Sequence, residues 1–259
     1  MSKTSRRHAL KMIAAATASL TLAPSFSLAG SKTLVCNWNG TFPPYSMEQG
    51  GRMTGILVDC LDDILGKRMG YTLVHRAYPW SKAQELVQSG EGDTLCTNPT
   101  DEREQFMIFS EEAVIESAPS IFCDKDNPLL PGINAVQTLD DLKAFRQVDY
   151  KGNGWARKTF PPSLNVRYVD TLDQAFRLIK DGEADIFVGN GLAARYALKQ
   201  SGLTLEFHAR ELPVGETSAF HFGLRKDYPD AQGVVEAFGE ALDEAQLDGT
   251  PRKIIMSYL

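Results

Sequence analysis

The sequence predicts an α/β protein made of two similar lobes, each a parallel-rich sheet flanked by helices, joined by a two-strand hinge. Three observations support this fold class. Strand-like and helix-like segments alternate along the chain, an eight-residue pattern recurs further along, and extended segments flank the second half. Alternation of this kind favours parallel sheets that are covered by helices.

The composition is that of a globular protein with a hydrophobic core. The 259 residues are 43% apolar and 23% charged, with a formal net charge of −6. Disordered chains have fewer apolar residues and more net charge, and a nucleic-acid surface needs clustered positive charge. We therefore expect a folded protein without a nucleic-acid partner. We also expect no membrane span, because no apolar run is long enough to cross a bilayer.

The first half of the chain is predicted to alternate between strands and helices. Strands are expected at residues 33–38, 71–75 and 93–97. Residues 57–65 place their leucines and isoleucine on one helical face, and residues 80–87 form a second amphipathic pattern. Gly70 and Gly90 follow these helices, at the position where glycine commonly ends a helix.

The second half repeats this order. A helix is expected to open at Thr138, which suits the N-cap position, and another over residues 172–179, ended by Gly182. Residues 147–150 and 166–169 are expected to be strands. The same local elements therefore occur twice along the chain.

A short repeat relates the two halves more directly. Residues 86–93 (LVQSGEGD) parallel residues 178–185 (LIKDGEAD), and an Asn follows each final Asp at the same spacing, at Asn98 and Asn190. Both copies are predicted to end a helix, turn at a glycine and start a strand. Because the structural context matches as well as the letters, two similar lobes are the better explanation.

The chain is expected to cross between the lobes twice. Residues 119–123 and 218–224 are extended segments on either side of the second lobe, and the helical tail, residues 234–247 and 252–259, would return to the first. The predicted limits are 32–115 for the first part of lobe 1, 116–216 for lobe 2 and 217–259 for the return to lobe 1. A double crossing can act as a hinge, and the crevice beyond the strands' carboxyl ends is the expected ligand site.

The first 29 residues resemble an export signal. A basic start precedes the short apolar stretch 12–22, and a small-residue cleavage site ends near Ala29. Residues 5–11 resemble a twin-arginine motif, with Ala9 where that motif prefers Phe. The Sec and twin-arginine routes both lead out of the cytoplasm, so we expect a periplasmic protein. The alternative is a disordered basic tail.

The four cysteines leave two possibilities open. They are widely separated, with no C-x-x-C pair and no His at ligand spacing, so no metal site and no cofactor are expected. In an exported protein they could form disulfides, or they could be buried thiols that behave as small hydrophobes. These residues are Cys36, Cys60, Cys96 and Cys123.

Several motifs, in order, resemble the family 3 extracellular solute-binding proteins. The motifs are Phe42-Pro43-Pro44-Tyr45, residues 53–59 (MTGILVD), residues 78–80 (YPW), residues 100–103 (TDER) with Phe109-Ser110, residues 138–142 (TLDDL) and residues 245–250 (AQLDGT). Each motif alone is weak evidence, but together they occur in the order typical of the family and span almost the whole chain after residue 30. The resemblance implies a type II periplasmic binding protein: a monomeric two-lobe clamp that closes on a small molecule and serves an ABC-transporter permease or a membrane sensor.

The resemblance also implies ligand-binding residues in the first lobe. Phe42 matches an aromatic platform for the ligand, and Trp80 starts a helix that often faces the cleft. Arg103 matches a carboxylate clamp, since a guanidinium can bind a carboxylate through two parallel hydrogen bonds. Thr97 and Asn98 lie near the groups that complete this clamp. The alternatives are packing roles for the two aromatic residues and a surface ion pair of Arg103 with Glu102 or Glu104.

In the second lobe, Gly152, Asn153 and Trp155 lie where the family has a glycine loop ahead of a helix, although an ordinary turn explains them equally well. Asn190 occupies the position where amino-acid receptors of this family usually have an Asp that binds the α-ammonium group. An amide cannot neutralise a buried ammonium. We therefore expect a small polar or anionic solute rather than a standard α-amino acid. Asp185 is expected to be structural, like Asp93.

The competing hypothesis is an enzyme on the same fold. Some proteins of this fold are periplasmic cyclohexadienyl or arogenate dehydratases, which need a general acid in the cleft. Glu216 is the best available candidate for this acid, but it is better explained as an ordinary surface charge. The chain has few histidines and no motif for a catalytic carboxylate. We therefore expect a binding protein with no catalytic residues.

Overall fold

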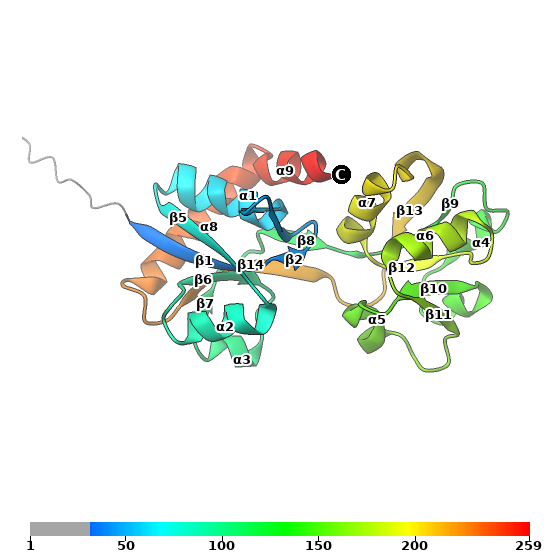
Figure 1. The fold of residues 1–259 in the computed structure, drawn as a ribbon, viewed down its shortest axis with the longest axis horizontal. Coiled ribbons are helices and arrows are strands. Elements are labelled where there is room, and N and C mark those ends of the chain that lie inside the picture. The colour runs from blue at the N-terminus through cyan, green and yellow to red at the C-terminus, as the bar shows by residue number, and fades with distance from the viewer. Residues whose placement is uncertain (1–31) are drawn as a thin grey trace, which may run out of the picture. The chain divides into compact units, whose positions relative to one another are not determined.

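The computed structural model describes residues 32–259, so the predicted export signal, residues 1–29, lies outside the described residues. The described chain is the expected α/β protein with two lobes, each built on its own sheet (Figure 1). The exact lobe limits given above stay predictions.

Lobe 1 is built on a six-stranded mixed sheet. The strand order is β5-β1-β6-β14-β7, and β8 pairs with β14. β1 is parallel to β5 and β6, whereas β14 is antiparallel to its neighbours. These strands are β1 (Thr33–Asn39), β5 (Thr72–Tyr78), β6 (Thr94–Thr97), β7 (Met107–Phe109), β8 (Ile115–Ser117) and β14 (Ser218–Arg225). A small separate sheet adds β2 (Thr41–Phe42), β3 (Ser46–Gln49) and β4 (Arg52–Thr54).

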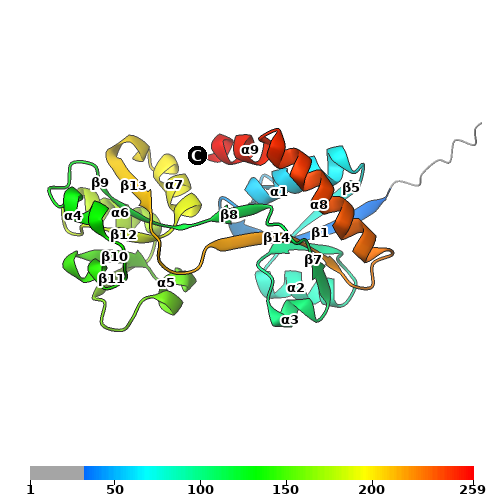
Figure 2. The ribbon, with the colours of Figure 1, turned by 180° about the vertical axis from the view of Figure 1, so that it is seen from behind.

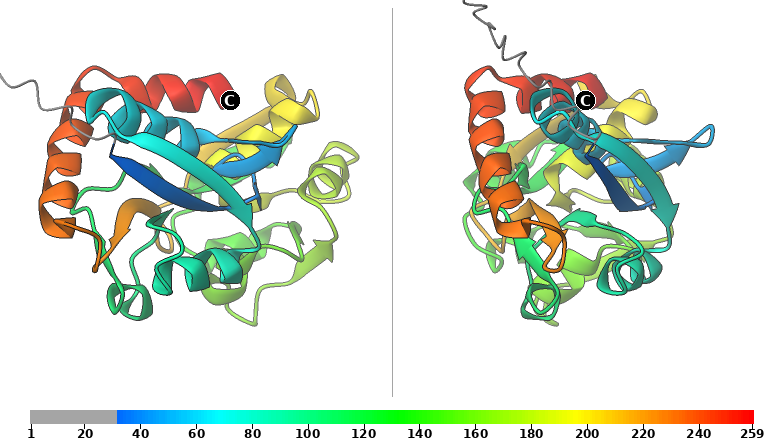
Figure 3. Two further views of the ribbon diagram at one scale, coloured as in Figure 1. Left: turned by 60° about the vertical axis from the view of Figure 1, so that its left-hand side comes forward. Right: turned by 90° about the vertical axis from the view of Figure 1, so that its left-hand side faces the viewer.

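Helices cover both faces of the lobe 1 sheet. They are α1 (Ile56–Leu61), the π-helix η1 (Asp62–Arg68), α2 (Trp80–Gln88), α3 (Asp101–Glu104), α8 (Ala231–Leu247) and α9 (Thr250–Tyr258). Alternate β1 side chains, such as Leu34 and Cys36, pack in the core cluster that includes α1 and α8. Asn37 faces the other way and donates to the Ala83 carbonyl of α2. α8 packs on β14, and α9 packs on α1 (Figure 3).

Lobe 2 has the same strand order as lobe 1. β12 and β13 flank β9 in antiparallel pairing, β10 is parallel to β11, and a bridge from Gln147 to Ile186 joins the two sets. The resulting order, β11-β10-β12-β9-β13, repeats β5-β1-β6-β14-β7 element by element. The strands are β9 (Pro119–Asp124), β10 (Gln147–Tyr150), β11 (Val166–Val169), β12 (Phe187–Asn190) and β13 (Phe207–Glu211).

Helices also cover both faces of the lobe 2 sheet. They are α4 (Leu130–Ala135), η2 (Asp141–Ala144), α5 (Gly154–Thr159), α6 (Leu172–Lys180), α7 (Gly191–Gln200) and η3 (Thr204–Glu206). Phe122 and Phe187 pack on the face covered by α6 and α7. Ile121 and Val188 pack on the face covered by α4 and η2.

The repeated Asp has the same structural role in each lobe. The backbone amide of Val35 donates to Asp93 Oδ2 (2.8 Å), and that of Arg146 donates to Asp185 Oδ2 (2.8 Å). An arginine side chain binds the other oxygen in both cases, Arg225 on Asp93 (2.9 Å) and Arg146 on Asp185 (2.6 Å). The carboxylates tie the turn before β6 to β1 and the turn before β12 to the start of β10, which confirms the structural role expected for Asp185.

Two crossings join the lobes (Figures 1 and 2). β8 leads through Ala118 into β9, and the chain returns from β13 into β14, which pairs with β8. The paired strands form the predicted hinge. The expected strands at 119–123 and 218–224 and both tail helices are confirmed, with ends shifted by a few residues.

Most expected helix ends are also confirmed, with one correction. Gly70, Gly90 and Gly182 have φ of 74°, 82° and 70°, values that glycine adopts without strain. The helix predicted from Thr138 is only the short 3₁₀ turn η2. The start is capped as expected, because Asp141 Oδ2 accepts from the Thr138 backbone N–H (2.9 Å) and Thr138 Oγ1 accepts from the Asp141 N–H (3.3 Å). The element stays short because the backbone is already extended at Phe145 and enters β10 at Gln147.

A candidate ligand site at the carboxyl ends of the strands

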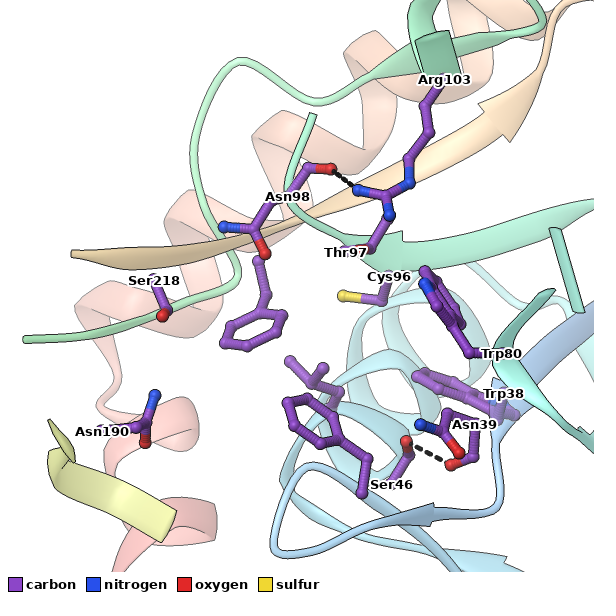
Figure 4. Close-up of a pocket in the computed structure, with 13 residues that line it drawn as sticks. Trp38, Asn39, Ser46, Trp80, Cys96, Thr97, Asn98, Arg103, Asn190 and Ser218 are labelled. Carbon is purple, nitrogen blue, oxygen red and sulfur yellow. Dashed lines mark hydrogen bonds between the residues drawn. The ribbon is translucent and has the colours of Figure 1, made fainter. Parts of the chain in front are cut away.

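A cavity of ≈ 290 Å³ lies where β1, β6 and β12 end (Figure 4). This is the edge at which ligands bind in open α/β sheets. Asn190 comes from lobe 2, Ser218 and Phe220 come from the returning strand β14, and the other lining residues come from the first part of lobe 1. The lining residues are Trp38, Asn39, Phe42, Ser46, Leu57, Trp80, Cys96, Thr97, Asn98, Arg103, Asn190, Ser218 and Phe220.

Aromatic rings form one wall of the cavity. Phe42 is 41% exposed and stacks on buried Tyr45, with ring centroids 5.0 Å apart and planes at 27°. Tyr45 in turn packs on Phe220 at 4.5 Å. The support below Phe42 holds its ring in place while its outer face stays open, which is the arrangement that a stacking platform requires.

Arg103 is held by neutral groups. Its Nε donates to Gln84 Oε1 (2.8 Å), its Nη1 donates to the Asn98 carbonyl (2.7 Å), and its guanidinium lies 5.3 Å from the Trp80 ring centroid. No carboxylate among residues 32–259 lies within ion-pair distance, so the predicted alternative, a pair with Glu102 or Glu104, is not seen. Burial lowers the pKa of Arg103, against a smaller opposing effect of Glu102. Two of the five N–H donors are used, and the rest are available to a ligand.

Asn190 has a fixed amide orientation. Its Oδ1 accepts from the Tyr45 hydroxyl (2.7 Å), the Ser117 hydroxyl (3.1 Å) and the Ala193 backbone N–H (3.0 Å), the last as the N-cap of α7. A backbone N–H can only donate, so the atom facing it must be the oxygen. The amide nitrogen has no partner in the described chain. Asn190 therefore offers the cavity a hydrogen-bond donor.

The lining as a whole is positive and rich in donors. Arg103 is its one charged residue. The Trp80 indole N–H and the Thr97 and Ser218 hydroxyls also have no protein partner within residues 32–259. Figure 4 shows Arg103 and Asn190 on opposite sides of the cavity. The hydroxyls and the Asn98 amide can also accept hydrogen bonds, so the feature that distinguishes this lining is the single positive charge of Arg103, which suits a ligand with an acidic group.

The other predicted binding residues do not line this cavity. Asn153 is buried: its Oδ1 caps α5 by accepting from Ala156 N (3.1 Å), and its Nδ2 donates to both oxygens of Asp149 (3.0 and 3.1 Å). Trp155 donates to the Glu216 carbonyl (3.2 Å). Gly152 lies beside the Tyr150 ring. Their role in binding stays a prediction, whereas Phe42, Trp80, Thr97, Asn98, Arg103 and Asn190 are brought together.

Sequence reasoning missed seven lining residues. Trp38 and Asn39 end β1 beside the end of β6, so the carboxyl-end rule applied to β1 would have found them. Ser218 and Phe220 lie on β14, which was predicted only as a crossing strand. The remaining three are Ser46, Leu57 and Cys96.

The cysteines are resolved as free thiols. All four are buried and unpaired, with Cys36, Cys60 and Cys96 in the lobe 1 core and Cys123 in lobe 2. Within residues 32–259, no group of His, Cys, Asp or Glu could hold a metal ion. None of the helices formed by these residues combines the length and apolar character needed to cross a membrane.

The chain has two lobes joined by two crossings, and residues of both lobes line the cavity. These features define a solute receptor of the periplasmic type. Residues 34–259 match the family described as bacterial extracellular solute-binding proteins, family 3. The chain therefore belongs to this family, as its motifs predicted.

Several known proteins with similar chains are named as binding proteins or receptors. A probable amino-acid ABC transporter-binding protein of Haemophilus influenzae is 23% identical over 88% of this chain and 85% of its own. The L-cystine-binding protein TcyA of Bacillus subtilis is 25% identical over 85% of this chain and 79% of its own. The L-cystine solute receptor of Neisseria gonorrhoeae has the same fold, with a TM-score of 0.71 at 18% identity over 88% of this chain and 93% of its own.

The chain is thus a solute-binding protein of the type that serves amino-acid ABC transporters. The dehydratase alternative has no support among these relatives, which are named for binding. Glu216, its only candidate residue, contributes a backbone carbonyl to Trp155 and does not line the cavity.

Proposed function

We propose that this protein captures a small carboxylate, or a similarly acceptor-rich solute, rather than a standard α-amino acid, and presents it to an ABC-transporter permease. The amide orientation of Asn190 is the observation that carries the proposal. The oxygen that could accept an ammonium proton is already bound by three protein donors. The group that remains free is a donor, which suits a carboxylate oxygen.

Charge balance supports the same ligand class. An α-amino acid brings an ammonium group that needs acceptors and a negative charge when it leaves water. The cavity lining contains no carboxylate. Arg103 supplies a positive charge with free N–H donors, and hydrogen bonds between charged partners are about twice as strong as neutral ones.

The cavity also constrains the rest of the solute. A volume of ≈ 290 Å³ suits a small molecule, and Phe42 offers an open aromatic face. The solute's carboxylate would meet Arg103, with Asn190 donating across the cavity, while an apolar or flat portion stacks on Phe42. Closure about the hinge would bring Gly152, Asn153 and Trp155 of lobe 2 toward the bound molecule.

A comparison of matched ligands tests the proposal. Thermal unfolding would be followed with pairs that differ only in the α-ammonium group, glutarate against glutamate and 3-phenylpropanoate against phenylalanine. A ligand at 100 times its Kd should add about 2.7 kcal/mol to the free energy of unfolding. We expect shifts from at least one carboxylate and none from its amino-acid partner. Larger shifts from the amino acids would overturn the proposal.

A further inference from the structure

Gln84 lies behind Arg103 and outside the cavity lining. It is on α2, one turn after Trp80, and its Oε1 accepts the Arg103 Nε proton (2.8 Å). The Asn98 carbonyl accepts from Nη1, and the Trp80 ring lies under the guanidinium. All three supports of this half-buried cation are uncharged.

The chemistry of position 84 decides how much of the Arg103 charge is available. A glutamine oxygen orients the guanidinium without cancelling its charge. A glutamate of almost the same size at 2.8 Å would form an ion pair, and a partly buried pair is poorly screened by solvent. A ligand carboxylate would then compete with a protein carboxylate for the same cation. The amide at position 84 keeps the site positive.

We infer that Gln84 is a positioning residue that sets the charge selectivity of the site: it holds Arg103 through a neutral hydrogen bond, so that the cavity prefers an anionic solute over the uncharged form of the same molecule. The inference rests on the proposed function, because it concerns the same cavity. Asn190 follows the same pattern on the opposite side, where a second amide supports the site without adding a negative charge.

The first experiment tests the contact without any ligand. Gln84→Glu should raise the thermal midpoint of the ligand-free protein by forming an ion pair with Arg103, and this rise should vanish when Arg103→Met is also present. Gln88→Glu is the control, because Gln88 is an exposed residue on the same helix and receives the same change of charge. Equal rises in both backgrounds, or no rise, would overturn the inference.

The second experiment measures selectivity with 3-phenylpropanoate and its uncharged amide, 3-phenylpropanamide, by calorimetry. Gln84→Glu should weaken carboxylate binding about tenfold or more and leave amide binding within about twofold. A merely structural role would weaken both ligands alike, and that result would overturn the inference. Gln88→Glu should change neither affinity.

The two proposals fail in different ways. If the unmodified protein bound phenylalanine more tightly than 3-phenylpropanoate, the proposed ligand class would be refuted. The thermal midpoints of the ligand-free variants would still show whether residues 84 and 103 interact. If the unmodified protein bound 3-phenylpropanoate and its amide equally, the charge selectivity would be refuted even though a solute is captured.

Discussion

Replacing Asn190 by Asp should reverse the ligand preference of the cavity. One carboxylate oxygen would keep the three donors that now bind the amide oxygen, from Tyr45, Ser117 and Ala193. The other oxygen would face the cavity in place of the amide N–H donors. A site for a carboxylate oxygen would become a site for an ammonium group.

The size of the change follows from the bond that is lost. A hydrogen bond to a charged group contributes about 2 kcal/mol, so its loss should weaken carboxylate binding roughly thirtyfold, and repulsion between the carboxylates adds to this. The fold should tolerate the change, because Asp is as good an N-cap as Asn and a negative charge is favourable at a helix N-terminus.

Calorimetry with glutarate and glutamate measures both sides of the reversal. In the Asn190→Asp variant, glutarate affinity should fall by that factor, and glutamate should bind at least tenfold more tightly than it binds the unmodified protein. Asn165→Asp, an exposed change in the same lobe, controls for net charge. A variant of unchanged stability that lost affinity for both ligands equally, or bound glutarate better, would refute the reasoning about the amide orientation.

Three further predictions concern stability and reactivity. Burial raises the pKa of Asp149 to about 6, against hydrogen bonds from Asn153 and the Tyr150 amide, so the folded protein binds this proton more tightly than the unfolded chain does. Its contribution to stability is complete below about pH 4 and is lost as the pH rises through 6. In urea titrations, the effect of Asp149→Asn on the free energy of unfolding should therefore be about 2 kcal/mol more favourable at pH 8 than at pH 4, and equal effects at both pH values would contradict this. Tyr45→Phe should cost about 1 kcal/mol in the same titrations, because the stacking on Phe42 remains while one hydrogen bond is lost, and an unchanged midpoint would mean that the bond to Asn190 contributes nothing. Burial raises the pKa of Cys36 and of Cys60 to about 12 and that of Cys123 to about 11, so a thiol reagent at pH 8 should label these three cysteines only after denaturant is added, and fast labelling of them in the native protein would show that these thiols are accessible.

The sequence predicts the fold well where the local signals are strong. Strands 147–150 and 166–169 and the glycine that ends α6 are observed where the pattern places them, because alternating apolar residues and an unstrained left-handed glycine are local properties. The helix predicted from Thr138 is limited to the short element η2, because the chain becomes extended at Phe145 and enters β10 at Gln147. The pairing of β10 with β11 is a contact between distant segments, which local periodicity does not encode.

The candidate site was predictable only in part. Phe42, Arg103 and Asn190 were found through motifs, and the cavity brings them together. No role in the site was predicted for Gln84 or Tyr45, and neither residue lines the cavity. Each acts through a contact with a residue far away in sequence, Arg103 and Asn190 respectively, and such contacts become visible only when the chain is folded.

The strand order determines which lobe can fold first. β14, residues 218–225, lies inside the lobe 1 sheet between β6 and β7, whereas all five lobe 2 strands come from the uninterrupted stretch 119–211. As the chain emerges from the ribosome or from a translocation channel, the lobe 1 sheet lacks the strand between β6 and β7 until residues 218–225 have emerged. The later half can assemble before it, so the protein is expected to mature from its middle outward.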